Sequence, residues 1–389
     1  MQHFDSINWP DGLSPERFVA EYWQQKPLYI PNAFPGFENP LPPDELGGLA
    51  CEPEVASRIL IESRGEKPWE LRQGPFEPEI FDWLGEDGWA LLVGDLDKAL
   101  PEFRHWLSPF RFIPDWRIDD LMASFAPPGG SVGAHFDHYD VFLWQVEGTR
   151  TWHIGPEPEA GYRLIPDLDI KVIAEPEFTE SFHVSPGDLL YLPPGYAHHG
   201  VAETACITWS VGFRAPTASD LANGWTDEAT QALSDAAPLR DPQFTLQTNP
   251  GEISQEARDR LRQSVAEALA SDGSAFDRWL GKHLTDRAAD VTLNTDDDGP
   301  SQVEALASGD AGLERRADIR FAYQMIADQC YLYAGGHEFA LPQATAAAIC
   351  QQWQWQDIEL AELLAMPKAA ELIADLLNAG FMEVWDVEQ

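Results

Sequence analysis

Basic residues are scarce in this chain of 389 residues. It holds 25 Lys and Arg against 65 Asp and Glu, which gives a formal net charge of −40. Phosphate backbones are bound by basic surfaces, so this imbalance argues against nucleic acid as a direct ligand. An acidic surface attracts a basic polypeptide substrate through long-range steering. Adaptation to a salty environment produces the same composition, and both explanations stay open at this point.

Cysteines and long apolar runs are also scarce. The four cysteines form no C-x-x-C pair; they are Cys51, Cys206, Cys330 and Cys350. Such scattered thiols exclude a disulfide framework and a thiolate zinc site, and indicate reduced thiols. No apolar run reaches the roughly 18 residues of a membrane-spanning helix. The N-terminus lacks the basic-then-apolar pattern of a signal peptide, so we expect a cytoplasmic protein without a membrane span.

The strongest chemical signal is the triplet His135-Phe136-Asp137, together with His198 further along the chain. Residues i and i+2 of a β-strand point to the same face, so His135 and Asp137 can reach one metal ion. Two imidazoles and one carboxylate, with coordination positions left open, are the ligand set of non-heme Fe(II) oxygenases. An H-x-D triplet also arises by chance, and most histidines are ordinary surface or core residues. The flanking sequence therefore has to show whether this triplet is a metal site or a chance match.

Turn and strand signals surround both parts of this motif. In chain order they are a Pro- and Gly-rich turn at 127–133, a strand at 140–146 with its expected hairpin partner at 149–154, a turn at 186–188 and a strand at 189–192. Apolar runs bounded by Gly and Pro are typical of strands in an antiparallel sheet. The order of strand, turn and histidine predicts the wall of a double-stranded β-helix.

Three stretches resemble the JmjC-type ribosomal oxygenases, the bacterial branch of the cupin-fold 2-oxoglutarate hydroxylases. They are DDLMASFAPPGGSVGAHFDHYDVFLWQVEGTRTWHIG (residues 119–155), PGDLLYLPPGYAHHG (186–200) and SVGFRAP (210–216). The resemblance is closest over residues 90–216 and points to the enzymes that hydroxylate an arginine of a large-subunit ribosomal protein. It implies a homodimer with an oxygenase domain, a helical dimerisation segment and a C-terminal winged-helix domain.

Residue by residue, the resemblance assigns the iron ligands to His135, Asp137 and His198. His198 is followed by His199, and strand alternation allows only one of the two to face inward. The family pattern Pro-Pro-Gly-x-x-His selects His198. The remaining histidines near the motif carry no such pattern. His138 is interpreted as a barrel-rim or substrate-side residue, and His153 and His183 as structural residues.

The resemblance also assigns Arg150 to the distal carboxylate of 2-oxoglutarate. A guanidinium suits that role because it can grip a carboxylate bidentately and stays charged when buried. The alternative is an Arg150 on the outer face that pairs with a surface acid. Related enzymes that act on histidine have a lysine here, so the arginine favours the arginine-modifying branch. Thr208 and Ser210, on the strand after His198, are further candidates for cosubstrate contact.

Asp120 and Met122 are the candidate substrate residues. They share one face of the predicted strand before the Pro-Pro-Gly-Gly turn. A cationic substrate side chain that enters the barrel mouth needs an acidic or aromatic partner, and Asp120 is placed to be one. An exposed acid at a strand end is the alternative interpretation of Asp120.

The length predicts two or three domains. We expect an oxygenase domain with its N-terminal lead-in at 1–215, a helical dimerisation segment at 216–295 and a winged-helix domain at 300–389, in a mixed α+β fold. The predicted elements outside the barrel motif are a helix that starts at Ser14-Pro15, strands at 27–31, 58–62 and 69–72, helices at 220–233 and 254–270, a linker at 294–300, a β-wing over 318–341, helices at 343–353, 357–365 and 368–379, and a strand at 381–385. An apolar stripe on the helix at 254–270 packs either on its own domain or on a second subunit.

Together these observations predict an Fe(II)- and 2-oxoglutarate-dependent dioxygenase that uses molecular oxygen to hydroxylate an arginine of a basic ribosomal protein. The alternatives are a histidyl protein hydroxylase, a small-molecule oxygenase of the same fold, a cupin metal enzyme that does not use 2-oxoglutarate, and a non-catalytic scaffold. A cupin enzyme of that other kind needs no arginine at 150, and a scaffold would have lost a metal ligand.

Overall fold

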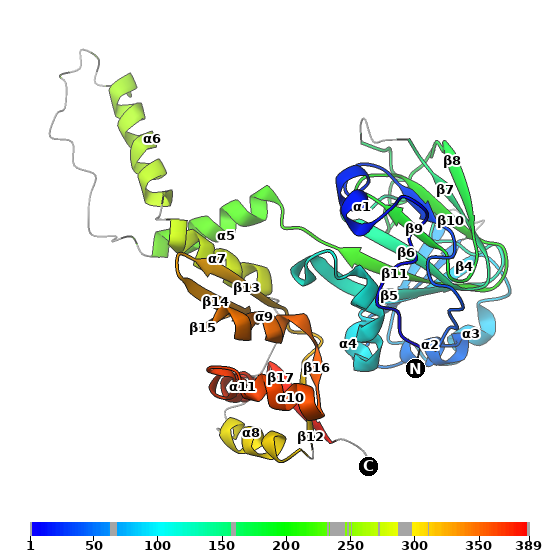
Figure 1. The fold of residues 1–389 in the computed structure, drawn as a ribbon. Coiled ribbons are helices and arrows are strands. Elements are labelled where there is room, and N and C mark those ends of the chain that lie inside the picture. The colour runs from blue at the N-terminus through cyan, green and yellow to red at the C-terminus, as the bar shows by residue number, and fades with distance from the viewer. Residues whose placement is uncertain are drawn as a thin grey trace. The chain divides into compact units, whose positions relative to one another are not determined.

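The chain divides into two compact units, Met1–Ala215 and Pro216–Gln389 (Figure 1). This computed structural model describes residues 2–62, 68–156, 161–231, 233, 246, 249, 251–270, 273–286, 298–309 and 311–386. None of the helices in these ranges combines the length and the apolar composition needed to cross a membrane. The predicted linker lies outside the described residues up to position 297.

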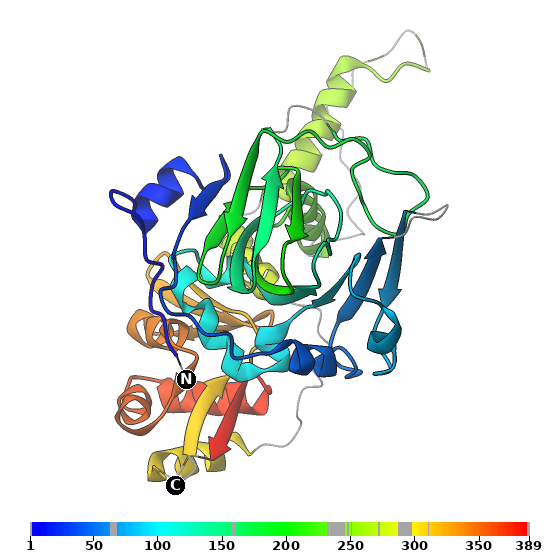
Figure 2. The ribbon, with the colours of Figure 1, turned by 90° about the vertical axis from the view of Figure 1, so that its right-hand side faces the viewer.

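The first unit is a barrel of two antiparallel sheets (Figure 2). The larger sheet has the spatial order β1 (Leu28–Ile30), β9 (Leu189–Leu192), β6 (Asp140–Glu147), β11 (Cys206–Phe213), β5 (Ile118–Ala126), β4 (Trp89–Val93), β2 (Ser57–Glu62) and β3 (Trp69–Gln73). The smaller sheet has the order β10 (His198–Ala202), β7 (Arg150–Ile154) and β8 (Glu180–Val184). Val141 and Leu143 of β6 pack against Trp152 and Ile154 of β7 between the two sheets. The predicted double-stranded β-helix is thereby confirmed.

The predicted hairpin between residues 140–146 and 149–154 is wrong. β6 pairs with β9 and β11 in the larger sheet, whereas β7 pairs with β10 and β8 in the smaller one. The turn between them carries the chain from one sheet to the other. Gly148 makes this crossing possible, because its φ is +62° and a Cβ there would overlap the carbonyl oxygen of Ala205.

Aromatic side chains cover the outer face of the larger sheet. Trp144 and Trp209, on neighbouring strands, have ring centroids 5.4 Å apart. Phe34 stacks on Trp144 at 3.8 Å, and Trp106 lies 5.7 Å from Trp209. Trp106 belongs to the 3-10 helix η1 (Pro101–Phe110), which the sequence did not predict. This layer leaves the opposite, inward face of the larger sheet to the site.

The N-terminal segment packs on the same outer face of the larger sheet. Helix α1 (Pro15–Glu21) starts as predicted, with the Ser14 side chain accepting a hydrogen bond from the backbone N–H of Arg17. Phe18 of this helix is buried, and its ring centroid lies 4.8 Å from that of Tyr191. The remaining short helices of the first unit are α2 (Pro43–Leu49), α3 (Ile80–Trp83), α4 (Leu96–Ala99) and η2 (Asp115–Arg117).

The second unit opens with three helices. They are α5 (Ala218–Gln231), α6 (Gln255–Leu269) and α7 (Gly273–Thr285), of which the first two were predicted. Trp225 Nε1 of α5 donates a hydrogen bond to the carbonyl of Leu269 in α6, 3.0 Å away. Within the apolar stripe of α6, Leu261 is 49% exposed and Val265 is 60% exposed. Helix α7 packs on the strands that follow.

The rest of the second unit has the strands and helices of a winged helix. One sheet has the order β16 (Gln354–Trp355), β12 (Ala311–Arg315) and β17 (Met382–Asp386). The other sheet has the order β13 (Phe321–Ile326), β14 (Gln329–Ala334) and β15 (His337–Leu341). The helices are α8 (Gly299–Ser308), α9 (Gln343–Gln351), α10 (Asp357–Leu364) and α11 (Ala369–Asn378). The predicted wing, the three last helices and the closing strand are confirmed. The sequence did not predict α8 or β12.

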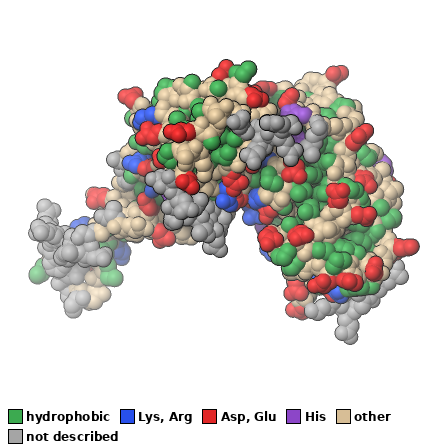
Figure 3. All heavy atoms as spheres, turned by 90° about the horizontal axis from the view of Figure 1, so that it is seen from below, with side chains coloured by type: hydrophobic (Ala, Val, Ile, Leu, Met, Phe, Trp, Pro, Cys, Tyr) green, Lys and Arg blue, Asp and Glu red, His purple; other side chains and the backbone are tan. Residues whose placement is uncertain are grey.

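The excess of acidic residues is visible at the surface. Acidic side chains are spread over the face drawn in Figure 3 rather than gathered in one patch, and few basic side chains lie among them. The net charge of −40 gives the protein a broad negative field.

Candidate metal centre

His135, Asp137 and His198 converge inside the barrel. Their possible ligand atoms all lie within 4.8 Å of one another, and His198 Nε2 is 3.6 Å from Asp137 Oδ2. In the part of the chain that the structure describes, no other group of three His, Cys, Asp or Glu residues has such spacing. His135 and Asp137 lie in the irregular segment before β6 rather than in a strand. Two imidazoles and a carboxylate in this arrangement fit a non-heme Fe(II) ion.

Backbone hydrogen bonds hold the three residues in place. The N–H of His135 donates to the carbonyl of His198 at 3.0 Å, and the N–H of His198 donates to the carbonyl of His135 at 2.8 Å. The N–H of Gly195 donates to the carbonyl of Asp137 at 2.7 Å. The two chain segments are thus paired directly at the site, although they are distant in the sequence.

Both imidazoles are oriented through Nδ1. His135 Nδ1 lies 2.9 Å from the carbonyl oxygen of Gly133, and His198 Nδ1 lies 3.0 Å from that of Tyr196. A carbonyl only accepts, so each Nδ1 carries the hydrogen and each Nε2 presents a lone pair, as metal-bound histidines do. Burial, together with the neighbouring His135, lowers the pKa of His198 to about 4. His198 is therefore neutral at pH 7.

The structure separates His198 from its neighbour His199. His198 is 2% exposed, and its ring centroid lies 5.8 Å from that of the inward-facing Trp152. His199 points to the other face of β10, where it stacks on Phe178 at 6.1 Å and lies 6.3 Å from His153. Of the two histidines, His198 is the one beside His135 and Asp137.

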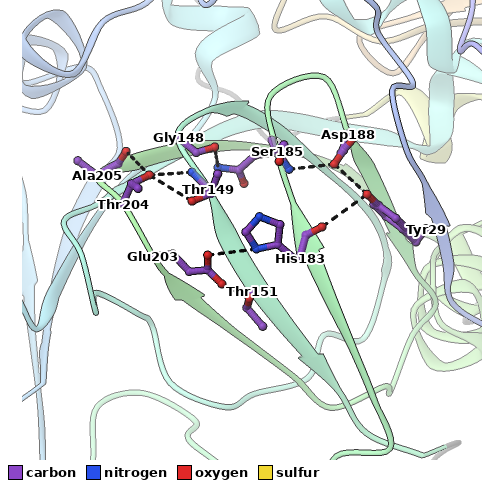
Figure 4. Close-up of polar contacts among 11 residues, drawn as sticks. Tyr29, Gly148, Thr149, Thr151, His183, Ser185, Asp188, Glu203, Thr204 and Ala205 are labelled. Atoms are coloured by element: carbon purple, nitrogen blue, oxygen red, sulfur yellow. Dashed lines mark hydrogen bonds and ion pairs between the residues drawn. The ribbon is translucent and has the colours of Figure 1, made fainter.

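The other histidines near the motif lie away from the centre. On the exposed face of the smaller sheet, His183 forms an ion pair with Glu203 at 3.1 Å, and Thr151 donates a hydrogen bond to the same carboxylate at 2.5 Å (Figure 4). His153 also lies on that face, with Nδ1 2.8 Å from the hydroxyl of Ser181. His138 is exposed. These contacts agree with the interpretation of these histidines as structural or rim residues.

Arg150 is buried in the barrel at 4% exposure. It shares the inward face of β7 with Trp152 and Ile154, and its guanidinium carbon lies 5.4 Å from the Trp152 ring centre. Among the described residues, nothing accepts a hydrogen bond from its Nε, which is buried. A buried cation with an unsatisfied donor requires an anion, so this arrangement fits the distal carboxylate of 2-oxoglutarate. The alternative of an outward-facing Arg150 is excluded.

Thr208 faces the same interior, where it meets a residue that sequence reasoning missed. Its hydroxyl donates to Gln145 Oε1 at 2.9 Å, and each residue is 1% exposed. The Gln145 amide donates in turn to the carbonyls of Glu147 and Gly148. Gln145 interrupts the inward apolar row of β6, which is the signal that could have identified it. Because its hydrogen is directed to Gln145, Thr208 is left with acceptor capacity toward a ligand.

Asp120 and Met122 lie on β5. Met122 is partly buried and packs against an inner apolar cluster that includes Leu92. β4 stops pairing with β5 at Ala123, and beyond this point the N–H of Leu121 donates to the buried carboxylate of Asp97 at 2.9 Å. That carboxylate replaces a neighbouring strand and so fixes the backbone that carries both candidate residues.

Tyr139 connects the metal centre to Asp120, and the sequence did not point to it. Burial raises the pKa of the Tyr139 hydroxyl above its usual range, and the charges of Asp137 and Asp120 raise it further. A Cβ added to Gly212 of β11 would lie 3.4 Å from Asp120 Oδ1 and 3.7 Å from the Tyr139 ring. A carboxylate and an aromatic ring thus border a gap that a glycine leaves open.

Comparison with known proteins agrees with these features. Residues 105–221 match the JmjC domain family, and residues 268–383 match the ROXA-like winged helix family. The chain is 32% identical to Ribosomal protein uL16 3-hydroxylase of Escherichia coli (strain K12), over 98% of this chain and 99% of that protein. It is also 32% identical to Probable ribosomal oxygenase of Haemophilus influenzae, over 77% of this chain and 76% of that protein.

Solved structures give the same result. The X-ray structure of Escherichia coli YcfD is 31% identical, with a TM-score of 0.84 over 99% of this chain and 100% of that one. The structure of the ribosomal oxygenase YcfD in complex with cobalt and 2-oxoglutarate is 30% identical, with a TM-score of 0.81 over 97% of this chain and 99% of that one. With identity and coverage of this extent on top of the JmjC barrel and winged-helix fold, the chain belongs to the JmjC-type ribosomal oxygenase family.

Proposed function

We propose that this protein is an Fe(II)- and 2-oxoglutarate-dependent hydroxylase of an arginine side chain in uL16, a protein of the large ribosomal subunit. The observation that carries the proposal is the convergence of His135, Asp137 and His198 in the same barrel as the buried Arg150. The choice of uL16 as the substrate rests on the similarity to the Escherichia coli uL16 3-hydroxylase.

The three converging residues would hold the metal, because two neutral imidazoles and a carboxylate suit Fe(II). When bound, iron, 2-oxoglutarate and molecular oxygen supply the oxidation of a C–H bond to an alcohol, with conversion of 2-oxoglutarate to succinate and carbon dioxide. The chain itself contributes position and exclusion. The Nδ1 contacts of His135 and His198 fix both rings, and the apolar residues of the two sheets keep water from the interior.

Arg150 separates this proposal from the competing classes. A cupin metal enzyme that does not use 2-oxoglutarate has no need of a buried guanidinium, and burying one without an anion is unfavourable. A non-catalytic scaffold has no need of three intact ligands. Arg150 would hold the distal carboxylate of the cosubstrate through paired charge-assisted hydrogen bonds. Thr208 is a weaker cosubstrate candidate, since its hydrogen is already directed to Gln145.

Asp120, Tyr139 and Met122 support an arginine substrate. A guanidinium at the barrel mouth would meet a carboxylate, an aromatic ring and an apolar stem-binding surface. The net charge of −40 would draw a basic ribosomal protein toward the enzyme. A histidine substrate or a small molecule would use the same metal centre, and substrate assays separate these alternatives.

A cytoplasmic homodimer with three parts completes the proposal, with 216–295 as the dimerisation segment and 300–389 as the winged helix. Leu261 and Val265 support it, because they leave an apolar stripe exposed on α6, and apolar stripes of this kind mark interfaces. A second copy of the chain would cover the stripe. A winged helix can bind DNA, but the excess of acids argues against direct contact with nucleic acid.

The first prediction concerns the metal ligands. His135→Ala and Asp137→Ala should each abolish 2-oxoglutarate turnover and lower iron content while thermal unfolding stays cooperative, because two ligands hold Fe(II) weakly. The adjacent pair His198→Ala and His199→Ala is the matched control, and only the former should lose activity. A more damaging His199→Ala would mean that the wrong neighbour is assigned.

The second prediction concerns Arg150. Arg150→Ala should raise the KM for 2-oxoglutarate by about 100-fold, since truncating one partner of a buried charge pair costs about 3 kcal/mol. Arg150→Lys keeps the charge and should be milder. Arg163→Gln, which removes an exposed guanidinium of the same unit, should leave this KM unchanged. An unaltered KM in Arg150→Ala would place the cosubstrate pocket elsewhere.

The third prediction concerns the substrate residue. Ribosomes from cells that lack this gene should have lost the mass of one oxygen atom from uL16. Peptides of uL16 that contain the modified arginine should be hydroxylated, and replacement of that arginine by lysine or histidine should reduce turnover strongly. Preference for the histidine peptide would move the enzyme to the histidyl branch, and turnover of no peptide would favour a small molecule.

The fourth prediction concerns the dimer. Leu261→Glu combined with Val265→Glu should convert a dimer to monomers in sedimentation experiments, because charges within an apolar contact are costly to bury. Glu256→Gln, on the same helix, should remain dimeric. A wild-type chain that sediments as a monomer at micromolar concentration would refute the proposed dimer.

A further inference from the structure

One ion pair lies beside the candidate substrate residues. Arg214 Nε is 2.5 Å from Asp119 Oδ2, and the two side chains are 63% and 22% exposed. The guanidinium carbon of Arg214 also lies 5.4 Å from the Tyr139 ring centre. Neither charged residue belongs to the metal triad or to the cosubstrate pocket described above.

A β-bulge brings Asp119 to this position. β11 pairs Val211 with Leu121 and then Phe213 with Ile118. Gly212 alone is therefore opposite both Asp119 and Asp120. A bulge of this kind redirects side chains, often next to functional sites.

Gly212 shows that both acids are directed to the same side. A Cβ on this glycine would lie 3.4 Å from Asp120 Oδ1 and 3.8 Å from Asp119 Cβ. Simple strand alternation would have sent neighbouring residues to opposite faces. Two adjacent acids consequently lie at this end of β5, and the carboxylate of Asp119 is paired with Arg214.

Two hydrogen bonds hold the main chain of Arg214 in place. The N–H of Arg214 donates to the carbonyl of Arg117 at 2.8 Å, and Nε of Arg117 donates to the carbonyl of Arg214 at 2.7 Å. Both hydrogen bonds join Arg214 to the residue just before β5. The main chain of Arg214 is therefore held at the same strand end as the acids, and its guanidinium contacts Asp119 from there.

We propose that Arg214 is a positioning residue that sets the charge of the substrate mouth by neutralising Asp119 beside Tyr139. A cationic substrate side chain then meets an Asp119 carboxylate whose charge is balanced by Arg214. This inference rests on the proposed function, because it takes the substrate to be an arginine of a basic protein. Loss of Arg214 makes the charge near the bulge more negative by one unit, whereas loss of the Asp119 charge makes it more positive by one unit.

The two substitutions change the local charge in opposite directions, so they should change the KM in opposite directions. The test uses the full-length holoenzyme with purified uL16 as substrate. Asp119→Asn should raise the KM for uL16 about fivefold, and Arg214→Gln should lower it by a similar factor, the size that one partly exposed ion pair supports. The change should appear in KM rather than in kcat. The double variant restores neutrality and should have a KM within about twofold of the wild-type value.

Salt and a surface pair serve as controls. The differences in KM should shrink as ionic strength rises, because exposed charges are screened over about 8 Å at physiological salt. Arg163 and Glu175 form an exposed ion pair elsewhere in the same unit. Arg163→Gln and Glu175→Gln should leave the KM for uL16 within about twofold of wild type.

The outcomes separate this inference from the function on which it rests. If both single variants at the mouth raise KM, the pair only stabilises the bulge, and the inference is wrong. If neither moves KM, the pair plays no part in substrate binding. A wild-type enzyme that leaves uL16 unmodified overturns the proposed function itself. Melting temperatures of all variants, with the charge-neutral double variant as reference, exclude misfolding as the cause of a shift.

Discussion

The site depends on the pair of backbone hydrogen bonds between His135 and His198. They join the segment that precedes β6, in the larger sheet, to the first residue of β10, in the smaller sheet. Because the bonds are between main-chain atoms, the fold places both imidazoles before any metal arrives. The ring contacts to Gly133 and Tyr196 then set the tautomers. A centre built in this way has little to rearrange on binding a metal, which favours a preformed site.

Buried charge distinguishes binding groups from structural ones in this barrel. Asp140 is 1% exposed, and its carboxylate accepts hydrogen bonds from Tyr191 at 2.6 Å and Gln24 at 2.9 Å. The protein itself satisfies that group. The Nε of Arg150 is equally buried, and no residue in the described ranges satisfies it. An unsatisfied buried donor is unfavourable, so this contrast supports the proposal that Arg150 binds the carboxylate of a cosubstrate.

The sequence allowed prediction of the triad, the strands and the winged helix, because each has a local pattern. The pairing of β6 and β7 could not be predicted. Alternation reports which side chains are buried but not which strand is the neighbour, and a short turn at Gly148 resembles a hairpin. Asp119 was missed for a related reason, because a bulge is invisible to strict alternation. Tyr139 and Gln145 become informative only once their neighbours in space are known.

The proposed function assigns metal binding and substrate choice to different elements. The triad comes from β10 and the segment before β6, whereas the acids at the mouth come from the bulge where β5 opposes β11. Residues at the bulge can therefore change without displacing a metal ligand. The carboxylate of Asp97, which holds β5 where β4 no longer does, makes that strand end a defined surface rather than a fraying edge. A rigid metal centre beside an independently built mouth explains how one barrel chemistry can serve several side chains in a family.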